Sequence, residues 1–504
     1  MSDAAVPDAS RPEGTAPYDP YALPPDALRE PPHSLWTALK QIGPGIILAG
    51  SIIGTGELLQ TTKMGAEHGF AFLWLILFSC VSKVFIQVEL GRHALSSGKP
   101  TLAALDALPG PRLGTHWLVW WWFFMLLATV FQLGAMVGGV GQAIHLLWPQ
   151  SNEAIVAWLQ PISPYLADKF TEHPSYPWAA PTALVAIGLL LSGGYKRIEV
   201  ITTLLVVAVT GVTVVCVLVL PFTGFSIPWP DVGRGLLVSL PADGQGVAIA
   251  FSVFGITGVG ASELYAYPYW CLEKGYARFT GVRQENDAWA HRARGWLRVM
   301  YLDAWVSMLV FTVATVSFYF MGATVLHKLH LVPEKKHMME RLAQMYVQAF
   351  GHPLTKTLFL IGGSVVLFKT LYVATASNSR LSADFVSLAR FTSYADASAR
   401  VRWINRFCVF YPLLALVLFF AFGDPAFMVL LGGFAQAVTL PLISGAAIYL
   451  RYKRTDRRLA PSLFTDICVW IAFLLIAAAA LYSAPIGIQD LWKSLLESLP
   501  FVAH

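Results

Sequence analysis

Charged residues are scarce in this chain of 504 residues. Asp, Glu, Lys and Arg make up 13% of it, whereas typical soluble domains carry about 25%. Hydrophobic residues make up 56%, which is more than a folded protein in water usually has. The scarcity of charge therefore excludes a large soluble domain and indicates that lipid surrounds most of the chain.

Cysteine is also rare and irregularly placed. The five Cys residues lie in or beside apolar stretches. They show neither the paired short spacings of a zinc motif nor the pattern of a disulfide framework. We expect them to be ordinary packing residues, and we predict no bound cofactor.

No catalytic motif is present. The sequence has no H-E-x-x-H pair, no G-x-S-x-G elbow and no P-loop. Gly258-Val259-Gly260 lacks the third glycine of a dinucleotide fingerprint. We therefore predict that the protein is not an enzyme. The basic residues are spread over many loops, so we also predict no nucleic-acid partner. The sequence carries no signal for an oligomeric state.

What the sequence does contain is a series of eleven apolar runs, most of them long enough to cross a bilayer. They lie at 42–62, 69–91, 117–145, 178–192, 198–220, 246–271, 299–325, 354–376, 403–422, 425–449 and 464–484. These runs predict an all-α polytopic membrane protein with about eleven transmembrane helices.

Lys and Arg are distributed unequally between the two sets of loops. If the N-terminus is cytoplasmic, 24 of the 35 lie in inside segments and nine in outside segments. Because cytoplasmic loops are enriched in Lys and Arg, we predict a plasma (inner) membrane protein with a cytoplasmic N-terminus and an external C-terminus. Residues 1–35, rich in proline and acidic residues, are predicted to be a disordered cytosolic tail rather than a signal peptide.

The first and sixth runs are interrupted by glycine and polar residues. The first contains Gly54-Thr55-Gly56-Glu57, and the sixth contains a glycine-rich stretch that ends at Glu263. Breaks in spans one and six are what two inverted five-helix repeats produce, and paired broken helices indicate a transporter binding site. We predict repeats at 36–225 and 226–450, and an extra helix with the external C-terminus at 451–504. This organisation is typical of a secondary active transporter that works by alternating access.

At these residues the sequence resembles the Nramp family of divalent metal transporters, over a region from about Gly43 to Leu481. Gly54-Thr55-Gly56-Glu57 stands where the family has Asp-Pro-Gly-Asn, and Gly65 keeps the family's offset of eight residues. Tyr267-Pro268-Tyr269 looks like the counterpart of the family's Met-Pro-His. The resemblance implies ten helices in two inverted repeats plus one extra helix. It also implies transport of a divalent metal ion, with a coupling ion in symport.

The resemblance also shows which family ligands are replaced. The family's Asp falls at Gly54, its Asn at Glu57, its Met at Tyr267 and its His at Tyr269. Its tenth-span Gln falls at Thr439, one turn after Gln436. Loss of the thioether and gain of a carboxylate favour hard ions such as magnesium or manganese over soft transition metals. The alternative is a small organic solute, an amine or amino acid, carried on the same scaffold.

Candidate residues follow from the breaks and from charge at bilayer depth, where an ionisable group is a functional hypothesis by default. The substrate-binding candidates are Gly54, Thr55, Glu57, Glu263, Ala266, Tyr267, Tyr269, Gln436 and Thr439, with Glu57 and Glu263 as metal ligands. The proton or coupling-ion candidates are Glu263, Lys369, Lys83 and Glu89. Gln132 and Asp303 are weaker candidates.

Each of these ionisable groups also has a structural interpretation. Glu57 could cap the second half of the first span, where the helix dipole favours a carboxylate. Lys369 could be a tethered cation, a proton carrier or one partner of a salt bridge. Lys83 and Glu89 could be structural or belong to a proton path.

Overall fold

The computed structural model describes residue 19 and residues 21–54, 56–239, 254, 257–332 and 338–498. In this part of the chain, helices account for every regular element except two short antiparallel strands, β1 (Arg112–Leu113) and β2 (Thr115–His116). The long helices are α4 (Leu73–Ser97), α6 (Trp117–Leu147), α9 (Tyr176–Leu191), α10 (Tyr195–Val219), α13 (Ala261–Lys274), α15 (Asp287–Met321), α18 (Leu354–Leu388), α19 (Ala397–Phe422), α20 (Pro425–Lys453) and α21 (Leu463–Ser498).

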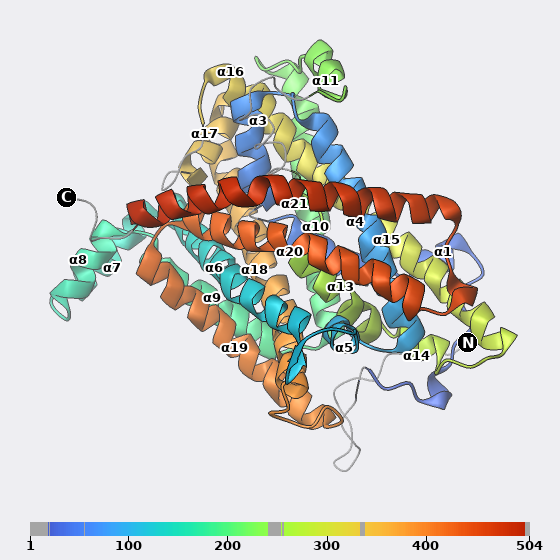
Figure 1. The fold of residues 1–504 in the computed structure, drawn as a ribbon. Coiled ribbons are helices and arrows are strands. Elements are labelled where there is room, and N and C mark those ends of the chain that lie inside the picture. Colours follow the sequence, from blue (N-terminus) through green and yellow to red (C-terminus); the bar gives the residue numbers. More distant parts are fainter. Residues whose placement is uncertain are drawn as a thin grey trace.

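Shorter elements begin, interrupt or connect these helices (Figure 1). They are η1 (Pro25–Ala27), α1 (Leu35–Leu39), α2 (Pro44–Ile52), the π-helical η2 (Gly56–Thr61), α3 (Thr62–His68), α5 (Thr101–Asp106), α7 (Pro149–Leu159), α8 (Pro164–Glu172), η3 (Leu220–Phe222), α11 (Trp229–Gly235), α14 (Tyr276–Thr280), the π-helical η4 (Gly322–Leu326), α16 (His327–Leu329), α17 (Met338–Phe350) and η6 (Arg457–Leu459).

Eight helices of the described residues are long and apolar enough to cross a membrane, or nine if the bent pair α8 and α9 counts as one span. The eight fall on all the predicted runs except the first, fourth and sixth. The first predicted span is missing from this set because it is divided into α2, η2 and α3, none of which is long enough alone. The all-helical membrane class is thus confirmed, while the number eleven stays a prediction.

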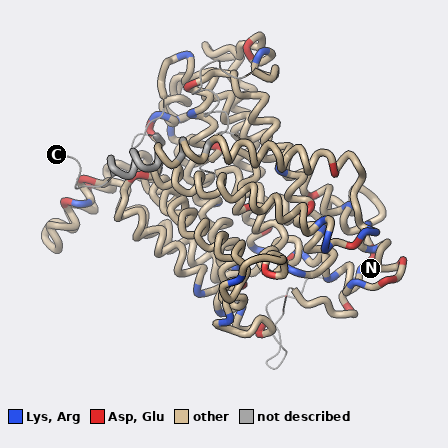
Figure 2. Tube along the Cα trace, in the orientation of Figure 1, with Lys and Arg blue, Asp and Glu red and all other residues tan. Residues whose placement is uncertain are grey.

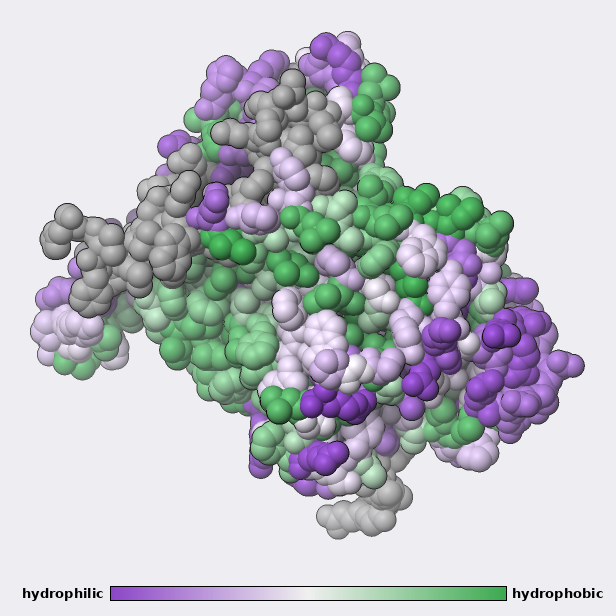
Figure 3. Space-filling model, viewed as in Figure 1, coloured by the Kyte–Doolittle hydropathy of each residue, from purple (hydrophilic) through white to green (hydrophobic). Residues whose placement is uncertain are grey.

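The spanning helices divide into a central and a peripheral group. Inside the molecule, 72% of the apolar window of α4 is buried, and 67% of that of α6, against 22% for the helix that begins at Tyr195 and 28% for α19. The peripheral helices expose large apolar side chains, such as Leu204 and Val417. Figure 3 shows a hydrophobic band between more polar ends, and Figure 2 shows that charge gathers towards these ends. This band is the surface that faces lipid.

The half-helices α2 and α13 lie in the centre. α2 packs against α10, α13, α15 and α18, and α13 packs against α4, α18 and α20. Asp303 of α15 holds the start of α2, because its two carboxylate oxygens accept hydrogen bonds from the backbone N–H of Gly43 (2.8 Å) and Gly45 (2.7 Å). Asp303, a weaker site candidate from the sequence, therefore acts as a helix cap supplied by another helix.

Residues 21–34 are ordered against the helical bundle, whereas the sequence predicted disorder for the whole segment 1–35. The backbone N–H of Arg29 donates to Phe279 (3.1 Å), and the Trp296 indole donates to the Arg29 carbonyl (2.9 Å). Leu28 packs onto Gly281 and Pro31 onto Gly295. Apolar residues of this proline-rich segment thus pack against a glycine that follows α14 and against a glycine of α15. The composition alone did not indicate these contacts.

Candidate functional site

The first break lies between α2 and η2. α2 ends at Ile52, and the chain resumes a helical course at Gly56 as a π-helix, a form that often marks functional sites. Gly54 lies against α18 so closely that a Cβ atom there would be 2.5 Å from the Thr370 hydroxyl oxygen. Thr55, a predicted contact, lies outside the described residues. Gly54 therefore packs against α18, and it is not among the residues that line the cavity described below.

The second break precedes α13. Residues 257–260 are irregular, and Gly258 adopts a φ of 70°, which favours glycine. A Cβ atom on Gly260 would lie 2.4 Å from Oε1 of Gln436 and 2.6 Å from Oε2 of Glu263. Glycine at this position is what lets the α20 amide and the Glu263 carboxylate approach the break.

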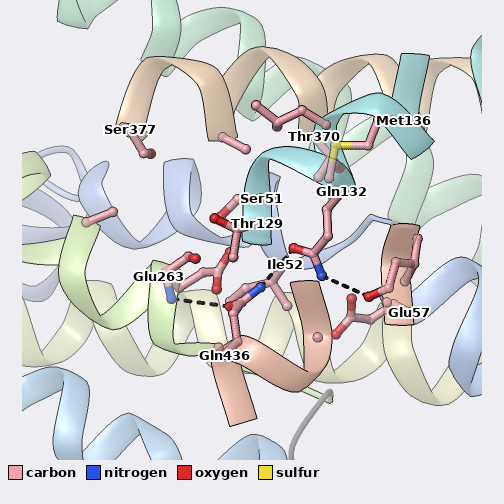
Figure 4. A pocket seen from close by; sticks show the side chains of 18 of the residues that line it. Ser51, Ile52, Glu57, Thr129, Gln132, Met136, Glu263, Thr370, Ser377 and Gln436 are labelled. Carbon is pink, nitrogen blue, oxygen red and sulfur yellow. Dashed lines mark hydrogen bonds between the residues drawn. The ribbon is translucent and has the colours of Figure 1, made fainter. Parts of the chain in front are cut away.

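A cavity of about 90 Å³ lies between the two breaks. Its walls come from the two broken helices and from α6, α18 and α20 (Figure 4). Its lining residues with polar side chains are Ser51, Glu57, Gln60, Thr129, Gln132, Ser262, Glu263, Thr370, Ser377, Asn378 and Gln436. The structure thus brings four predicted side chains, Glu57, Glu263, Ala266 and Gln436, to one cavity.

Glu57 joins the two breaks directly. Its side chain is buried, with 2% of the residue exposed, and its Oε1 atom accepts a hydrogen bond from the Gly258 N–H (3.2 Å). One carboxylate lone pair is therefore used by the second break, and the rest of the group lines the cavity. This bond goes to the other broken span, and not to the second half of the first span that the sequence suggested Glu57 could cap; its role as a ligand stays a prediction.

Two glutamine amides form a chain across the cavity. The Gln436 amide donates to the Gln132 carbonyl oxygen (2.9 Å) and accepts from the Ser262 N–H (3.2 Å). The Gln132 amide donates to the Val429 carbonyl (3.4 Å). In Figure 4 these amides lie between Glu263 and Glu57, with Ser51 beside Glu263. The hydrogen bonds fix which amide oxygens can face a bound solute.

The predicted lysines lie at the breaks rather than in the cavity wall. The Lys369 ammonium donates to the carbonyls of Gly50 (2.7 Å) and Ile53 (2.6 Å), at the end of α2. The Lys83 ammonium donates to the carbonyls of Phe254 (2.5 Å) and Thr257 (2.8 Å), at the second break. Neither lysine lines the cavity.

The structure does not bring four other predicted residues to the cavity. The Tyr267 hydroxyl donates to Asp303 (3.2 Å), and the Tyr269 hydroxyl donates to Asp384 (2.8 Å). The reason is that α13 already begins at Ala261 and stays helical through Pro268. Both tyrosines therefore lie within the helix, more than one turn after the break.

Thr439 and Glu89 also have partners elsewhere. The Thr439 hydroxyl accepts from the Trp121 indole (3.0 Å). Glu89 is buried between Arg92 (3.1 Å) and Arg451 (3.2 Å), in an ion-pair network that links α4 to α20. Both residues therefore hold helices together at a distance from the cavity.

Sequence reasoning missed Thr129, Ser377 and Asn378 as cavity residues. Thr129 stands among apolar residues of α6, whereas Ser377 and Asn378 stand in a polar stretch of α18 that runs from Thr375 to Arg380. The available signal was the spacing of Thr129 and Gln132, which are three residues apart and therefore share a helix face.

Oxygen dominates the chemistry of the cavity. Two carboxylates, four amides and several hydroxyls face it. Nowhere in the described part of the chain do three His, Cys, Asp or Glu residues form a group able to hold a metal ion. Such a cavity suits a cation that takes oxygen ligands and keeps part of its water.

Comparison with known proteins gives a family and a fold. The family model described as natural resistance-associated macrophage protein-like, Nramp, matches residues 45–484. Metal transporter Nramp6.2 of Populus trichocarpa is 28% identical over 113 residues, which are 22% of this chain and 19% of that protein. The chain thus matches less than a fifth of the length of this curated relative.

Two solved structures match the fold of this chain over nearly its whole length. A mutant manganese transporter of Eremococcus coleocola has a TM-score of 0.65 at 16% identity, covering 94% of each chain. A nucleobase-cation-symport-1 family transporter with bound bromovinylhydantoin has a TM-score of 0.51 at 12% identity, covering 91% of this chain and 94% of that one. At these identities the likeness shows a common fold. With the family match over most of its length, this chain belongs to the Nramp family, as an integral multi-pass membrane protein.

Proposed function

We propose that this protein is a secondary active transporter that moves a divalent cation by alternating access, with hard ions such as manganese or magnesium preferred over soft transition metals. The observation that carries the proposal is the position of Glu57 and Glu263. The two helix breaks each supply one carboxylate to the same cavity. Two negative charges from separate half-helices fit a doubly charged ion.

The donor set supports a hard ion. Thioether and thiolate ligands favour soft metals, whereas carboxylate, carbonyl and water suit magnesium, calcium and manganese. The cavity offers the carboxylates together with the oxygens of Ser51, Thr129 and Gln132. Among the described residues of its wall, the one sulfur is the thioether of Met136, on the α6 side.

The size of the cavity suits an ion with its waters and is too small for a large organic solute. A volume of about 90 Å³ admits a cation with several waters, since one water needs about 10–15 Å³ by this kind of measure. Pockets for drug-sized organic ligands are about 300–1,000 Å³. The names of the relatives agree, because they describe a metal transporter and a manganese transporter.

The membrane arrangement is part of the proposal. We place the N-terminus in the cytoplasm and the C-terminus outside, in a plasma (inner) membrane, because 24 of 35 basic residues then lie inside. Residues 36–225 and 226–450 would be the inverted repeats, with 451–504 as the extra helix. Movement of the half-helices α2 and α13 against the helices around them would open the cavity to each side in turn. Glu263 is our candidate for carrying a coupling proton.

Uptake into proteoliposomes tests this function. The purified protein is reconstituted with a metal-sensitive dye inside, and manganese is added outside, with magnesium, calcium and cadmium as competitors. We expect saturable uptake that Glu57→Gln abolishes. Glu67→Gln is the matched control, since Glu67 pairs with Lys63 on the surface of α3 (3.6 Å). Absence of uptake of every divalent ion by the folded wild type contradicts the proposal and turns the search to amines and amino acids.

A further inference from the structure

The last carbonyls of α2 face the side chain of Lys369. Gly50 and Ile53 accept hydrogen bonds from its ammonium at 2.7 and 2.6 Å, and the lysine is fully buried. The last four carbonyls of any α-helix have no partner within the helix. Because α2 stops in the middle of the protein, its last carbonyls need partners from elsewhere. Lys369 of α18 supplies one.

The two carbonyls that bind this ammonium also accept hydrogen bonds from a hydroxyl. The Thr370 hydroxyl oxygen lies 3.4 Å from the Gly50 carbonyl oxygen and 3.3 Å from that of Ile53. Carbonyl and hydroxyl oxygens are ligands for hard cations. The carbonyl end of a helix also carries the negative end of its dipole, which favours a positive charge.

The second break repeats this arrangement with a lysine from another helix. The Lys83 ammonium lies 2.5 Å from the Phe254 carbonyl and 2.8 Å from that of Thr257. The Ser79 hydroxyl lies 3.0 Å from both carbonyl oxygens. Among the described residues, each break therefore has two backbone carbonyls that accept hydrogen bonds both from one fully buried lysine and from one neighbouring hydroxyl.

Hydrogen bonding alone does not require a lysine at these places. A buried Ser, Asn or Gln could donate to the carbonyls, whereas burying a charge carries a large desolvation penalty unless the site stabilises it. That the chain has an ammonium at both breaks indicates that positive charge is what these positions need. The two positive charges also offset the carboxylates of Glu57 and Glu263, which line the cavity.

We propose that Lys369 and Lys83 are built-in monovalent cations, each filling a cation site that the backbone carbonyls at a break create. The protein then needs no dissolved sodium or potassium ion at either break. Removing a lysine turns its place into an open site for a small monovalent cation. This inference concerns the breaks themselves and holds whichever solute the cavity carries.

The test uses the purified full chain and its thermal unfolding, without any divalent cation. Lys369→Ala vacates the ammonium position, and Lys369→Met fills it with an uncharged chain of similar length. Unfolding midpoints are compared in about 100 mM sodium, potassium or choline chloride, because an ion that binds only the folded state raises the midpoint with its concentration. Choline is too large for the vacated position.

We expect the wild type to unfold at the same temperature in all three salts. Lys369→Ala should unfold several degrees lower in choline and recover part of the loss in sodium or potassium. Lys369→Met should be low in every salt. Lys83→Ala should repeat the pattern of Lys369→Ala. A midpoint of Lys369→Ala that is the same in all three salts overturns the proposal.

If Lys369→Ala does not fold, Lys369→Gln tests whether this position requires a positive charge. Its amide has two N–H donors for the two carbonyls but no charge. A midpoint below that of the wild type supports a requirement for charge, and a midpoint equal to the wild type overturns it. Because no divalent ion is present, these results are separate from those on metal uptake and Glu57.

Discussion

The carboxylate of Glu273 and the guanidinium of Arg380 form a two-pronged ion pair between α13 and α18, with N···O distances of 2.6 and 3.0 Å. Both side chains are only 7% exposed. Arg380 also lies over the Trp270 ring, 4.5 Å from its centroid. The pair sits at the end of α13 away from the break, on the proposed cytoplasmic side. It therefore holds the end of α13 against α18.

Breaking this pair should open the cavity towards the cytoplasm. In Glu273→Gln we expect a cysteine placed at Ser377, in the cavity wall, to react several times faster with a membrane-impermeant thiol reagent applied to the cytoplasmic face. Removal of one partner from a buried pair also destabilises the fold by about 3–5 kcal/mol. The exchanged pair Glu273→Arg with Arg380→Glu should slow labelling again. Equal labelling in all variants would show that the pair does not close the cavity.

The contact between Gly54 and Thr370 predicts coupled effects of substitution. A Cβ atom at Gly54 would lie 2.5 Å from the Thr370 hydroxyl oxygen and 2.6 Å from its methyl group. We expect Gly54→Ala to lower the free energy of unfolding by about 1–3 kcal/mol, as overpacking usually does. Thr370→Ala removes those atoms, so the double variant should be more stable than the sum of the single effects predicts. If the changes in unfolding free energy, measured with denaturant, are additive, the strain of Gly54→Ala does not come from contact with Thr370.

We predict that the stability of the protein depends on pH through Asp456, which lies in the connection between α20 and α21. Hydrogen bonds from Arg458, supported by Arg283, hold the pKa of the Asp456 carboxyl well below its usual range, although partial burial opposes them. A pKa lowered by folding stabilises the protein above the unfolded-state pKa, about 4 for Asp. That stabilisation is lost as the pH falls towards the folded-state pKa.

We therefore expect Asp456→Asn to unfold several degrees below the wild type at pH 7, and the two midpoints to converge as the pH falls below about 4. Asp231→Asn, which changes an exposed residue paired with Arg234 at 2.7 Å, is the control and should differ little from the wild type at any pH. A gap between Asp456→Asn and the wild type that persists at low pH would contradict the electrostatic explanation.

The sequence predicted the helix breaks and the acidic residues in them because both signals are local. Glycine next to a polar residue within an apolar run leaves backbone groups that only a cavity or protein contacts can satisfy. Glu57 and Glu263 stand in such runs, and the structure brings both to the cavity. Gln436 was found one turn before the residue that the family alignment indicated, and it is Gln436 that lines the cavity.

The tyrosine predictions depended on where the second half-helix begins, and that start is not a local property of Pro268. Proline usually ends or bends a helix, so Tyr267 and Tyr269 were interpreted as part of the break. In the structure Gly258 and Gly260 make the break and α13 runs through Pro268. Which glycine or proline interrupts a buried helix is decided by close contacts such as that of Gly260 with Gln436.

Hydrophobic periodicity did not show that Thr129 and Asn378 face the cavity, because α6 is apolar on nearly every side and α18 is polar at most positions around Asn378. In such helices hydrophobic periodicity does not show which face points inward. The same limit applies to the lysines. Their position at bilayer depth was visible in the sequence, but the carbonyls that receive their charge, such as Gly50 and Phe254, belong to other helices.

Binding of divalent cations to the purified protein, measured by titration calorimetry, tests the central claim most directly. Manganese, magnesium, calcium and cadmium are titrated into the wild type, Glu57→Gln and the surface control Glu67→Gln. Our account predicts saturable binding of a hard ion to the wild type and to Glu67→Gln. It also predicts at least a tenfold weaker affinity in Glu57→Gln, about 1.4 kcal/mol or more, with the fold retained. Equal affinity in all three proteins, or no binding of any ion to the folded wild type, would contradict it.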